Sequence, residues 1–212
     1  MAHYPIVLTG SIVAVVIGGG QVAERKVQGL LQAGAEVKVI SPCLTPALAR
    51  LAQDGRIQAE LRNYLPGDLV DAHLAIAATN DAAVNAAVAE EAHWRGCLIN
   101  VVDDPQLSNF HVPAVIRRGK VTIGISTAGA SPALARYLRR LLESLIGPEY
   151  GQLAEIFAEL RPQWRARERY ENTPCPGWEQ LIDTALSLLR TGQLQEARTL
   201  VLEFIRQAPQ EG

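Results

Sequence analysis

The fold of this chain is decided by the stretch Ile12-Val13-Ala14-Val15-Val16-Ile17-Gly18-Gly19-Gly20-Gln21-Val22-Ala23. It begins with a short apolar run rich in β-branched residues, which is typical of a strand buried on both faces of a parallel sheet. Three glycines follow, and the residues from Val22 to Leu31 carry apolar side chains at the three- and four-residue spacing of a helix. The stretch therefore predicts a strand, a glycine turn and a helix in direct succession.

The glycines and the residues after them match the pattern G-x-G-x-x-[GA]. In this pattern Gly18 permits the tight turn, Gly20 lets a diphosphate approach the backbone, and the small Ala23 lets the helix pack against the strand. The N–H groups at the helix start then hold the phosphate charge. A tight turn without a ligand is the alternative, but the position between a strand and a helix favours a dinucleotide. Gly18, Gly19 and Gly20 are therefore candidate cofactor-binding residues.

Strands and helices continue to alternate up to about residue 112. The sequence predicts strands at 37–40, 74–78 and 98–102, and helices at 45–51 and 81–92. Such alternation implies right-handed crossovers between parallel strands. We therefore expect an α/β protein in which residues 1–112 form a Rossmann-like, NAD-binding domain.

The alternation stops after residue 112. Residues 114–125 predict two strands around Gly119, and Ser131-Pro132 starts a helix that ends at Gly147-Pro148. Three further helical segments are expected at roughly 152–169, 179–190 and 193–206. The chain is thus divided into the first domain, a mixed segment at 113–148 and a small helical C-terminal domain at 149–212.

Composition and charge exclude several classes of protein. Apolar residues make up 48% of the 212 residues, enough for a substantial core, and the net charge of -2 gives no global attraction to nucleic acid or acidic membranes. No apolar run approaches the ~20 residues that span a bilayer, and the first residues lack the features of a signal peptide. Three isolated cysteines argue against a disulfide framework or a zinc site. We expect a cytoplasmic protein without a nucleic-acid or membrane partner.

The end of the second predicted strand reads Ile40-Ser41-Pro42-Cys43. A carboxylate usually binds the ribose hydroxyls at this place, and none is present here. Ser41 could hydrogen-bond a ribose. No arginine is near in the sequence to bind a 2′-phosphate, so NAD is preferred over NADP. Cys43 is expected to be a small loop residue rather than a nucleophile.

The next two predicted strands also end in polar residues. Thr79 and Asn80 lie where open α/β sheets bind ligands, although capping of the following helix is an equal alternative. Asp103 and Asp104 are adjacent carboxylates, whose repulsion could raise one pKa and suit general acid–base work. A polar turn before Pro105 is the alternative. His111 lies a few residues further along the chain and is also a site candidate. The alternative is that it is a structural histidine.

The segment between Pro105 and Leu142 contains six basic and no acidic residues. One interpretation is that these charges simply cover a solvent-exposed helix face. The alternative is that they bind a polyanionic ligand. DNA is less favoured as that ligand, because no recognition motif accompanies the charge. Within it, the small-residue loop from Ser126 to Ser131 leads into a helix and could cradle an anion or simply cap that helix.

The chain resembles the precorrin-2 dehydrogenase family, the NAD-dependent module at the front of siroheme synthases. The resemblance covers residues 1 to about 145 and rests on five stretches: Tyr4-Pro5, Gly18-Gly19-Gly20-Gln21-Val22-Ala23-Glu24-Arg25-Lys26, Ala75-Ile76-Ala77-Ala78-Thr79-Asn80, Asn100-Val101-Val102-Asp103 and Ser126-Thr127-Ala128-Gly129-Ala130-Ser131-Pro132-Ala133-Leu134-Ala135-Arg136. Ala128 and Ala130 depart from the family, whose members often carry glycine and a polar residue there.

The resemblance implies oxidation of precorrin-2 to sirohydrochlorin with NAD⁺ as hydride acceptor, and in some relatives insertion of ferrous iron. It implies homodimers formed through the segment 113–148 and a tetrapyrrole substrate whose carboxylates suit the basic residues. Asp103 becomes the catalytic acid–base, with a share in handling the metal, and no other residue receives a metal-binding role. The remaining expected cofactor contacts are Gln21, Val22, Pro42, Cys43 and Asn100, and the expected substrate contacts are His111, Ser126, Thr127, Ser131 and Arg136. A non-catalytic NAD-sensing or tetrapyrrole-carrier module and a chelatase are the alternatives.

Overall fold

A computed structural model describes residues 5–167 and 177–207 of the chain. Its contacts divide into two compact units, of which one ends at Val112 and the other begins at Pro113. Cys175 and the turn-rich segment around it lie outside the described residues.

The first unit is built on a five-stranded parallel sheet in the order β3-β2-β1-β4-β5. Its elements in chain order are β1 (Val13–Ile17), α1 (Gln21–Gln32), β2 (Glu36–Ile40), α2 (Pro46–Gln53), β3 (Gln58–Glu60), β4 (Leu74–Ala77), α3 (Ala82–Arg95) and β5 (Leu98–Val101). The predicted Rossmann-like α/β fold is confirmed. The short edge strand β3 was not expected, because three residues with polar ends give no hydrophobic pattern to read.

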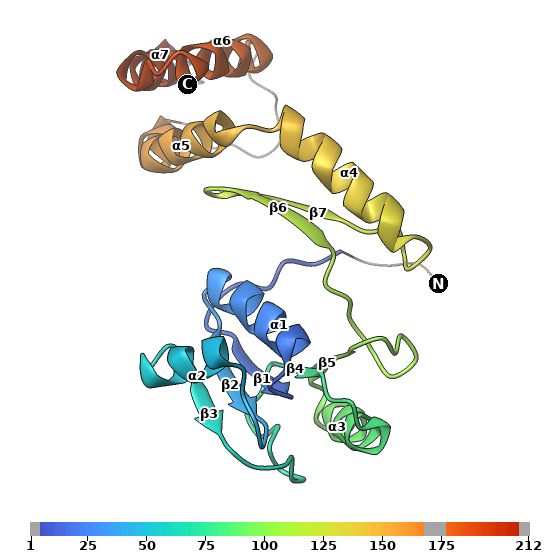
Figure 1. Cartoon of the computed structure of the whole chain (residues 1–212). Coiled ribbons are helices and arrows are strands. Elements are labelled where there is room, and N and C mark those ends of the chain that lie inside the picture. The colour runs from blue at the N-terminus through green and yellow to red at the C-terminus, as the bar shows by residue number, and fades with distance from the viewer. Residues whose placement is uncertain (1–4, 168–176, 208–212) are drawn as a thin grey trace. The chain divides into compact units, whose positions relative to one another are not determined.

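The two faces of this sheet carry separate cores. Ala14, Val16 and Ile76 face α1 and α2, whereas Val15, Ile17 and Ile99 pack with the buried residues of α3 (Figure 1). The central strands are buried on both faces, which explains their continuous apolar sequence. Helices on both faces hold the sheet rigid and leave its strand ends to the connecting loops.

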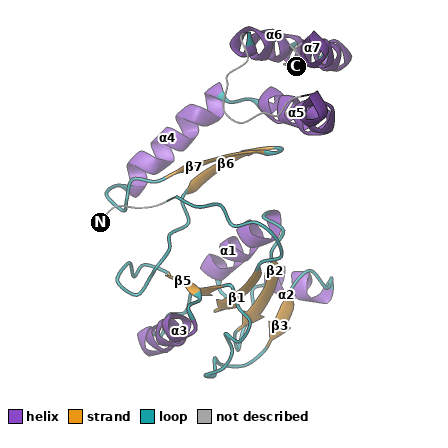
Figure 2. Cartoon of the chain, turned by 180° about the vertical axis from the view of Figure 1, so that it is seen from behind, coloured by secondary structure: helices purple, strands orange, loops and turns teal. Residues whose placement is uncertain are grey.

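The second unit begins with an antiparallel hairpin, β6 (Ala114–Arg118) and β7 (Val121–Ile125), joined at Gly119 as expected. The helix α4 (Pro132–Leu145) packs against this hairpin (Figure 2). Arg118 donates from Nε to the Ile146 carbonyl at 2.9 Å and so ties the hairpin to the end of α4.

Three further helices complete the second unit: α5 (Pro148–Arg167), α6 (Trp178–Arg190) and α7 (Leu194–Gln207). α5 starts at Pro148 rather than near residue 152, because a proline suits the first turn of a helix as well as it ends the previous one. Their shared core includes Leu153, Leu186 and Val201. No helix in the described part of the chain is long and apolar enough to cross a membrane.

Candidate functional site

The carboxyl edge of the parallel sheet gathers the polar segments that the sequence singled out in the first unit. Ile17 lies beside Ile40 and Ala77 in the strand register, and Ala77 lies beside Val101, so β1, β2, β4 and β5 end in one row. The segments that leave this row are 18–20, 41–43, 79–80 and 102–103. The crossovers reverse direction between β1 and β4, and this is the place where open α/β sheets bind ligands.

The first two glycines of the turn are required by the packing of the protein itself. Gly18 has a φ of 121°, and a Cβ there would lie 2.4 Å from the carbonyl oxygen of Ala78. A Cβ at Gly19 would lie 2.0 Å from the carbonyl oxygen of Cys43. No other residue fits either position without moving the neighbouring backbone.

Gly20 differs from the other two glycines because the protein leaves the space beside it open. A Cβ at Gly20 would meet nothing within 4 Å, and its backbone is extended, with φ -83° and ψ -174°. It is the N-cap of α1, yet no side chain caps this helix, and Gln21 and Val22 in the first turn are exposed. An uncapped helix start with room in front of it fits the diphosphate of a dinucleotide.

The turn after β2 uses its own polar groups internally. Ser41 is 7% exposed and donates its hydroxyl to the Cys43 carbonyl at 2.8 Å, which leaves only the lone pairs of that hydroxyl for a ribose. Pro42 and Cys43 are exposed at the edge. The acidic residue that the fold adds here is Glu60, beside Ile40 in the register. Its carboxylate is bound by Lys38 and Arg62, and the hydrogen bond from Lys38 is the main cause of its lowered pKa.

Thr79 and Asn80 do not cap the next helix. The carboxylate of Asp81 accepts from the backbone N–H groups of Ala83 and Val84 and caps α3, so the capping alternative for Thr79 and Asn80 was wrong. Asp81 is the N-cap residue of α3, the position from which a side chain can reach these N–H groups. Thr79 instead donates to Oδ1 of Asn85 at 2.7 Å, and Asn80 stays exposed at the edge.

The two adjacent aspartates have different environments. Asp104 accepts at Oδ1 from the backbone N–H groups of Gln106 and Leu107, at 3.0 and 3.2 Å, so the polar-turn interpretation holds for this residue. Asp103 is exposed, has a φ of 61°, and its carboxylate makes no hydrogen bond to the described residues. Aspartate adopts this left-handed region more readily than most residues other than glycine. Asp103 is thus the carboxylate that remains available at the sheet edge.

Asn100 and Lys26 form a part-buried hydrogen bond between β5 and α1. Lys26, on α1, donates from Nζ to Oδ1 of Asn100 at 3.2 Å, and Nδ2 of Asn100 donates to the Phe110 carbonyl at 3.2 Å. Burial lowers the pKa of Lys26, repulsion by Arg25 adds to this, and attraction by Asp103 opposes it. The sequence did not single out Lys26 as a site residue. Its partner Asn100 lies 74 positions away in the chain, and no local pattern indicates this contact.

The other expected substrate contacts lie at and beyond the boundary of the first unit. Ser131 accepts at Oγ from the Leu134 N–H and caps α4, so its capping role is confirmed. Thr127 exchanges two hydrogen bonds with the backbone of Ser131, and Ser126 accepts from the Ala128 N–H. Arg136 and His111 are exposed. The loop is therefore held by its own hydroxyls, and Ala128 adopts a φ of 53°, in the left-handed region that favours glycine.

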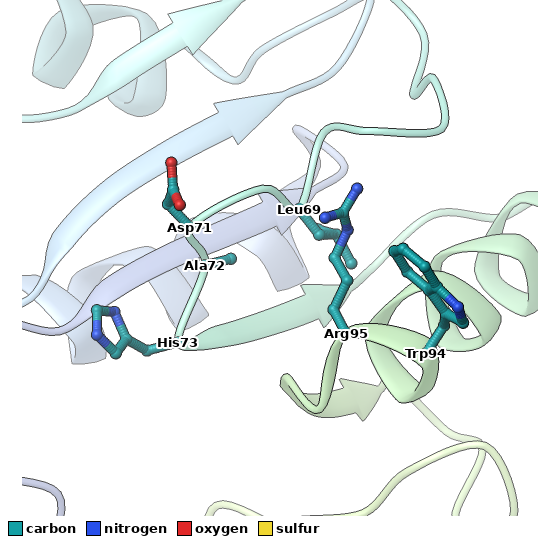
Figure 3. A pocket seen from close by; sticks show the side chains of 6 residues that line it. All are labelled: Leu69, Asp71, Ala72, His73, Trp94 and Arg95. Atoms are coloured by element: carbon teal, nitrogen blue, oxygen red, sulfur yellow. The ribbon is translucent and has the colours of Figure 1, made fainter.

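A hollow of about 570 Å³ lies at the opposite end of β4 from this edge (Figure 3). Its residues already serve the fold: His73 accepts at Nδ1 from the Val13 N–H, and Arg95 is paired with Glu91 at 2.6 Å. The residues that line it are Leu69, Asp71, Ala72, His73, Trp94 and Arg95. The candidate site is therefore the carboxyl edge and not this hollow. Among residues 5–167 and 177–207, no three His, Cys, Asp or Glu side chains are grouped to hold a metal ion.

Comparison with known proteins gives two matching sequence families. Residues 9–114, half of the chain, match the family described as "Putative NAD(P)-binding", and residues 118–145 match "Sirohaem biosynthesis protein central". The first match contains the glycine turn and Asp103, and the second contains the loop 126–131 and all of α4.

Curated relatives cover most of the chain. The siroheme synthase of Methylobacillus flagellatus is 41% identical over 184 residues, which are 86% of this chain and 39% of that protein. The siroheme synthase of Methylococcus capsulatus is 39% identical over 212 residues, which are 96% of this chain and 43% of that protein. The chain thus spans about two fifths of the length of these relatives.

A solved structure, "SirC, precorrin-2 dehydrogenase", has the same fold. It superposes with a TM-score of 0.68 and 24% sequence identity over 96% of this chain and 99% of that one. The chain therefore belongs to the family described as "Putative NAD(P)-binding", and it is similar to a part of the siroheme synthases that makes up about two fifths of their length.

Proposed function

We propose that this chain is a precorrin-2 dehydrogenase, which oxidises precorrin-2 to sirohydrochlorin with NAD⁺ in siroheme biosynthesis. The observation that carries the proposal is the common edge that holds both the open N-terminus of α1 and the unbonded carboxylate of Asp103. The names of the relatives and of the superposed structure support the same reaction.

The cofactor is proposed to lie along the carboxyl edge of the sheet. The N–H groups of Gln21 and Val22 would bind the diphosphate in the space beside Gly20, and Ser41, Pro42 and Cys43 would contact the ribose. NAD is favoured over NADP because Arg62, the arginine that the fold brings near this turn, is bound to Glu60 and Asp68. When bound, NAD⁺ supplies the acceptor for a hydride.

The chemistry left to the protein is the removal of one proton. Loss of a hydride and a proton from the macrocycle is a two-electron oxidation, and the proton needs an acceptor beside the reacting carbon. Asp103 is proposed as this acceptor because it is exposed at the edge and its neighbour Asp104 is committed to the turn.

The substrate is proposed to bind through its carboxylates. Arg136 is exposed on α4, and the loop that carries Ser126, Thr127 and Ser131 leads into the N-terminus of that helix. Guanidinium groups bind carboxylates with charge-assisted hydrogen bonds. His111, just before the boundary between the units, completes the proposed set.

The working form is proposed to be a homodimer joined through the segment 113–148. α4 has no buried residue, and one of its faces exposes Leu134, Tyr137, Leu141 and Leu145. Exposed apolar side chains at helical spacing are typical of an interface. Residues 149–212 are proposed as a helical domain, and the location as cytoplasmic, where Cys43 and Cys97 would stay reduced.

A single incubation tests the proposed function. The purified chain is mixed with precorrin-2 and NAD⁺, and NADH and the product chromophore are followed by absorbance, with NADP⁺ in a parallel sample. NADH formed in step with sirohydrochlorin supports the dehydrogenase. NAD⁺ binding without any absorbance change would favour the carrier or sensor instead, and metal insertion into sirohydrochlorin without NAD⁺ would add the chelatase.

A further inference from the structure

Asn85 lies in the first part of α3 and binds the loop that leaves β4 at the carboxyl edge. Its Oδ1 accepts from the Thr79 hydroxyl at 2.7 Å and from the Thr79 N–H at 3.4 Å, and its Nδ2 donates to the Thr79 carbonyl at 3.1 Å. The amide thus binds both backbone groups of Thr79, as a neighbouring strand would. This pair of contacts requires a donor and an acceptor on one planar group, which a side-chain amide offers.

The position of Asn85 is set by the packing of α3 on the sheet. Val88, Ala89 and Ala92 are buried in the core beneath this helix, and Asn85 precedes them at the three- and four-residue spacing of one helix side. Because α3 begins soon after β4 ends, Asn85 reaches the loop while these apolar neighbours anchor its helix. The amide is therefore presented by a rigid element rather than by another loop.

The contact with Thr79 also determines where the Ala78 carbonyl lies. The peptide between Ala78 and Thr79 is trans, so its N–H and C=O groups point in opposite directions. The N–H is bound to Asn85 on α3, and the carbonyl lies at the glycine turn, where a Cβ at Gly18 would be 2.4 Å from its oxygen. Asn85 thus orients the peptide that packs directly against the first glycine of the turn.

The polar groups of Thr79 are used within the protein, whereas those of Asn80 are not. The Thr79 hydroxyl is shared between Asn85 and the backbone of Asp81, and both backbone groups of Thr79 are bound to Asn85. Asn80 is exposed, and its side chain makes no hydrogen bond to the described residues. Asn80 is therefore the side chain of this loop that remains available to a ligand at the edge.

We propose that Asn85 is a positioning residue for the cofactor edge: its amide holds the Ala78–Thr79 peptide against Gly18 and keeps Asn80 at the edge where the cofactor is proposed to bind. This inference rests on the proposed function, because it concerns the cofactor of that reaction. Asn85 acts through the loop and does not itself contact the cofactor. A loop that is fixed before NAD⁺ arrives removes an ordering cost from binding.

The test compares Asn85→Ala with the matched control Val88→Ala. Asn85→Ala removes the amide, whereas Val88→Ala removes apolar contacts from the same side of α3 and no hydrogen bond to the loop. We expect Asn85→Ala to raise the Kd for NAD⁺ about tenfold and to leave kcat at saturating NAD⁺ within about twofold. Val88→Ala should lower the melting temperature at least as much and leave the Kd for NAD⁺ unchanged.

Hydrogen exchange of the Thr79 amide gives a readout that needs neither cofactor nor substrate. This N–H donates to Oδ1 of Asn85, so it should exchange roughly tenfold faster in Asn85→Ala than in the unchanged chain. In Val88→Ala the exchange of this amide should change no more than that of the other amides near the start of α3. NMR measures both, and the amide resonance of Gly18 should move in Asn85→Ala alone.

The inference is overturned if Asn85→Ala binds NAD⁺ as tightly as the unchanged chain, if Val88→Ala loses the same affinity, or if the Thr79 amide exchanges equally with and without Asn85. An unchanged chain that binds NAD⁺ but forms no NADH from precorrin-2 would refute the proposed reaction alone. The affinity and exchange measurements would then still decide the role of Asn85, whereas an unchanged chain that binds no NAD⁺ would overturn both proposals.

Discussion

The three adjacent glycines stand in two different physical situations. Gly18 and Gly19 are needed because a side chain would meet the backbone of Ala78 or Cys43, so they serve the packing of loops around the sheet edge. Gly20 faces open space, so no contact within the described part of the chain requires the missing side chain. The motif therefore contains two positions that the fold itself requires and one, Gly20, that we assign to the proposed cofactor.

This difference predicts opposite outcomes for two alanine substitutions. Gly19→Ala should destabilise the chain by about 1–3 kcal/mol, because its methyl group overlaps the Cys43 carbonyl. Gly20→Ala should leave the melting temperature unchanged but raise the Kd for NAD⁺ about tenfold, equal to ~1.4 kcal/mol. Thermal unfolding and NAD⁺ titration of both variants check this, and equal NAD⁺ affinity of Gly20→Ala and the unchanged chain would place the diphosphate elsewhere.

The two aspartates of the β5 turn give a second matched pair. Asp103→Asn should lower kcat for NADH formation by roughly 10²–10⁴-fold with little change in stability, because it removes only the proton acceptor. Asp104→Ala should keep kcat within a few-fold and lower stability by about 1 kcal/mol, because Gln106 and Leu107 lose their acceptor. Steady-state kinetics and urea unfolding measure both effects, and the reverse pattern would exchange the roles of the two residues.

At the scale of elements, the connection between β3 and β4 is held by ionic groups. Asp68 accepts from both terminal nitrogens of Arg62, at 2.7 and 2.6 Å, and from the Leu65 N–H at 2.8 Å. Glu91 on α3 accepts from the N–H groups of Gly67 and Leu69 and so fastens the same loop to a helix. The loop leads directly into β4, so these contacts help to place that strand beside β1.

The Asp68 contact predicts how stability depends on pH. The hydrogen bond from Arg62 is the main cause of the lowered pKa of Asp68, so the folded state favours the carboxylate. This stabilisation is fully present above the unfolded pKa of about 3.9 and is lost as the pH falls through the lower folded value. The difference in melting temperature between the unchanged chain and Asp68→Asn should therefore be constant from about pH 5 to 7 and shrink below about pH 4.

Asp71→Asn is the control for this measurement, since Asp71 is an exposed carboxylate of the same connection and asparagine tolerates its φ of 64°. Its melting temperature should follow that of the unchanged chain at every pH. A pH-independent effect of Asp68→Asn would show that the contact is steric rather than ionic.

At the scale of the whole molecule, the chain consists of two units with their own cores. The buried clusters around the parallel sheet draw only on residues of the first unit, and the helical cluster draws only on α5, α6 and α7. The amphipathic helix α4 belongs to the second unit but contributes to none of these cores. Its exposed apolar face is the feature that a second copy of the chain would cover.

The dimer prediction follows from this face. Leu141→Glu together with Leu145→Glu should turn the dimer into a monomer in light scattering, because two charges cannot be buried unpaired in an apolar interface. Arg140→Glu, on the charged side of α4, should leave the mass of the particle unchanged. A monomeric unchanged chain, or a dimer that survives the double substitution, would show that α4 does not form the interface.

The sequence by itself determined the class of fold, because continuous apolar strands, a glycine turn and capped helices are local signals that agree with one another. The strand at Val13–Ile17, the caps of α2 and α4 and the hairpin at Gly119 all follow from neighbouring residues. The sequence did not predict the short strand β3, because its three residues with polar ends carry no hydrophobic pattern. It also did not predict where α5 starts, because a proline suits both the end of one helix and the first turn of the next.

Only the tertiary structure decided which residue of each motif is left open at the sheet edge. The glycine pattern and the family resemblance already singled out Gly20 and Asp103, but the contacts that set them apart from Gly19 and Asp104 appear only in the fold, where the turn after β2 meets Gly19 and the backbone after Asp104 binds its carboxylate. Lys26 meets Asn100 across 74 positions because α1 packs over the sheet. The physical reason is that burial, clashes and the partners of a charge depend on contacts distant in sequence, whereas helices, strands and turns depend on neighbours.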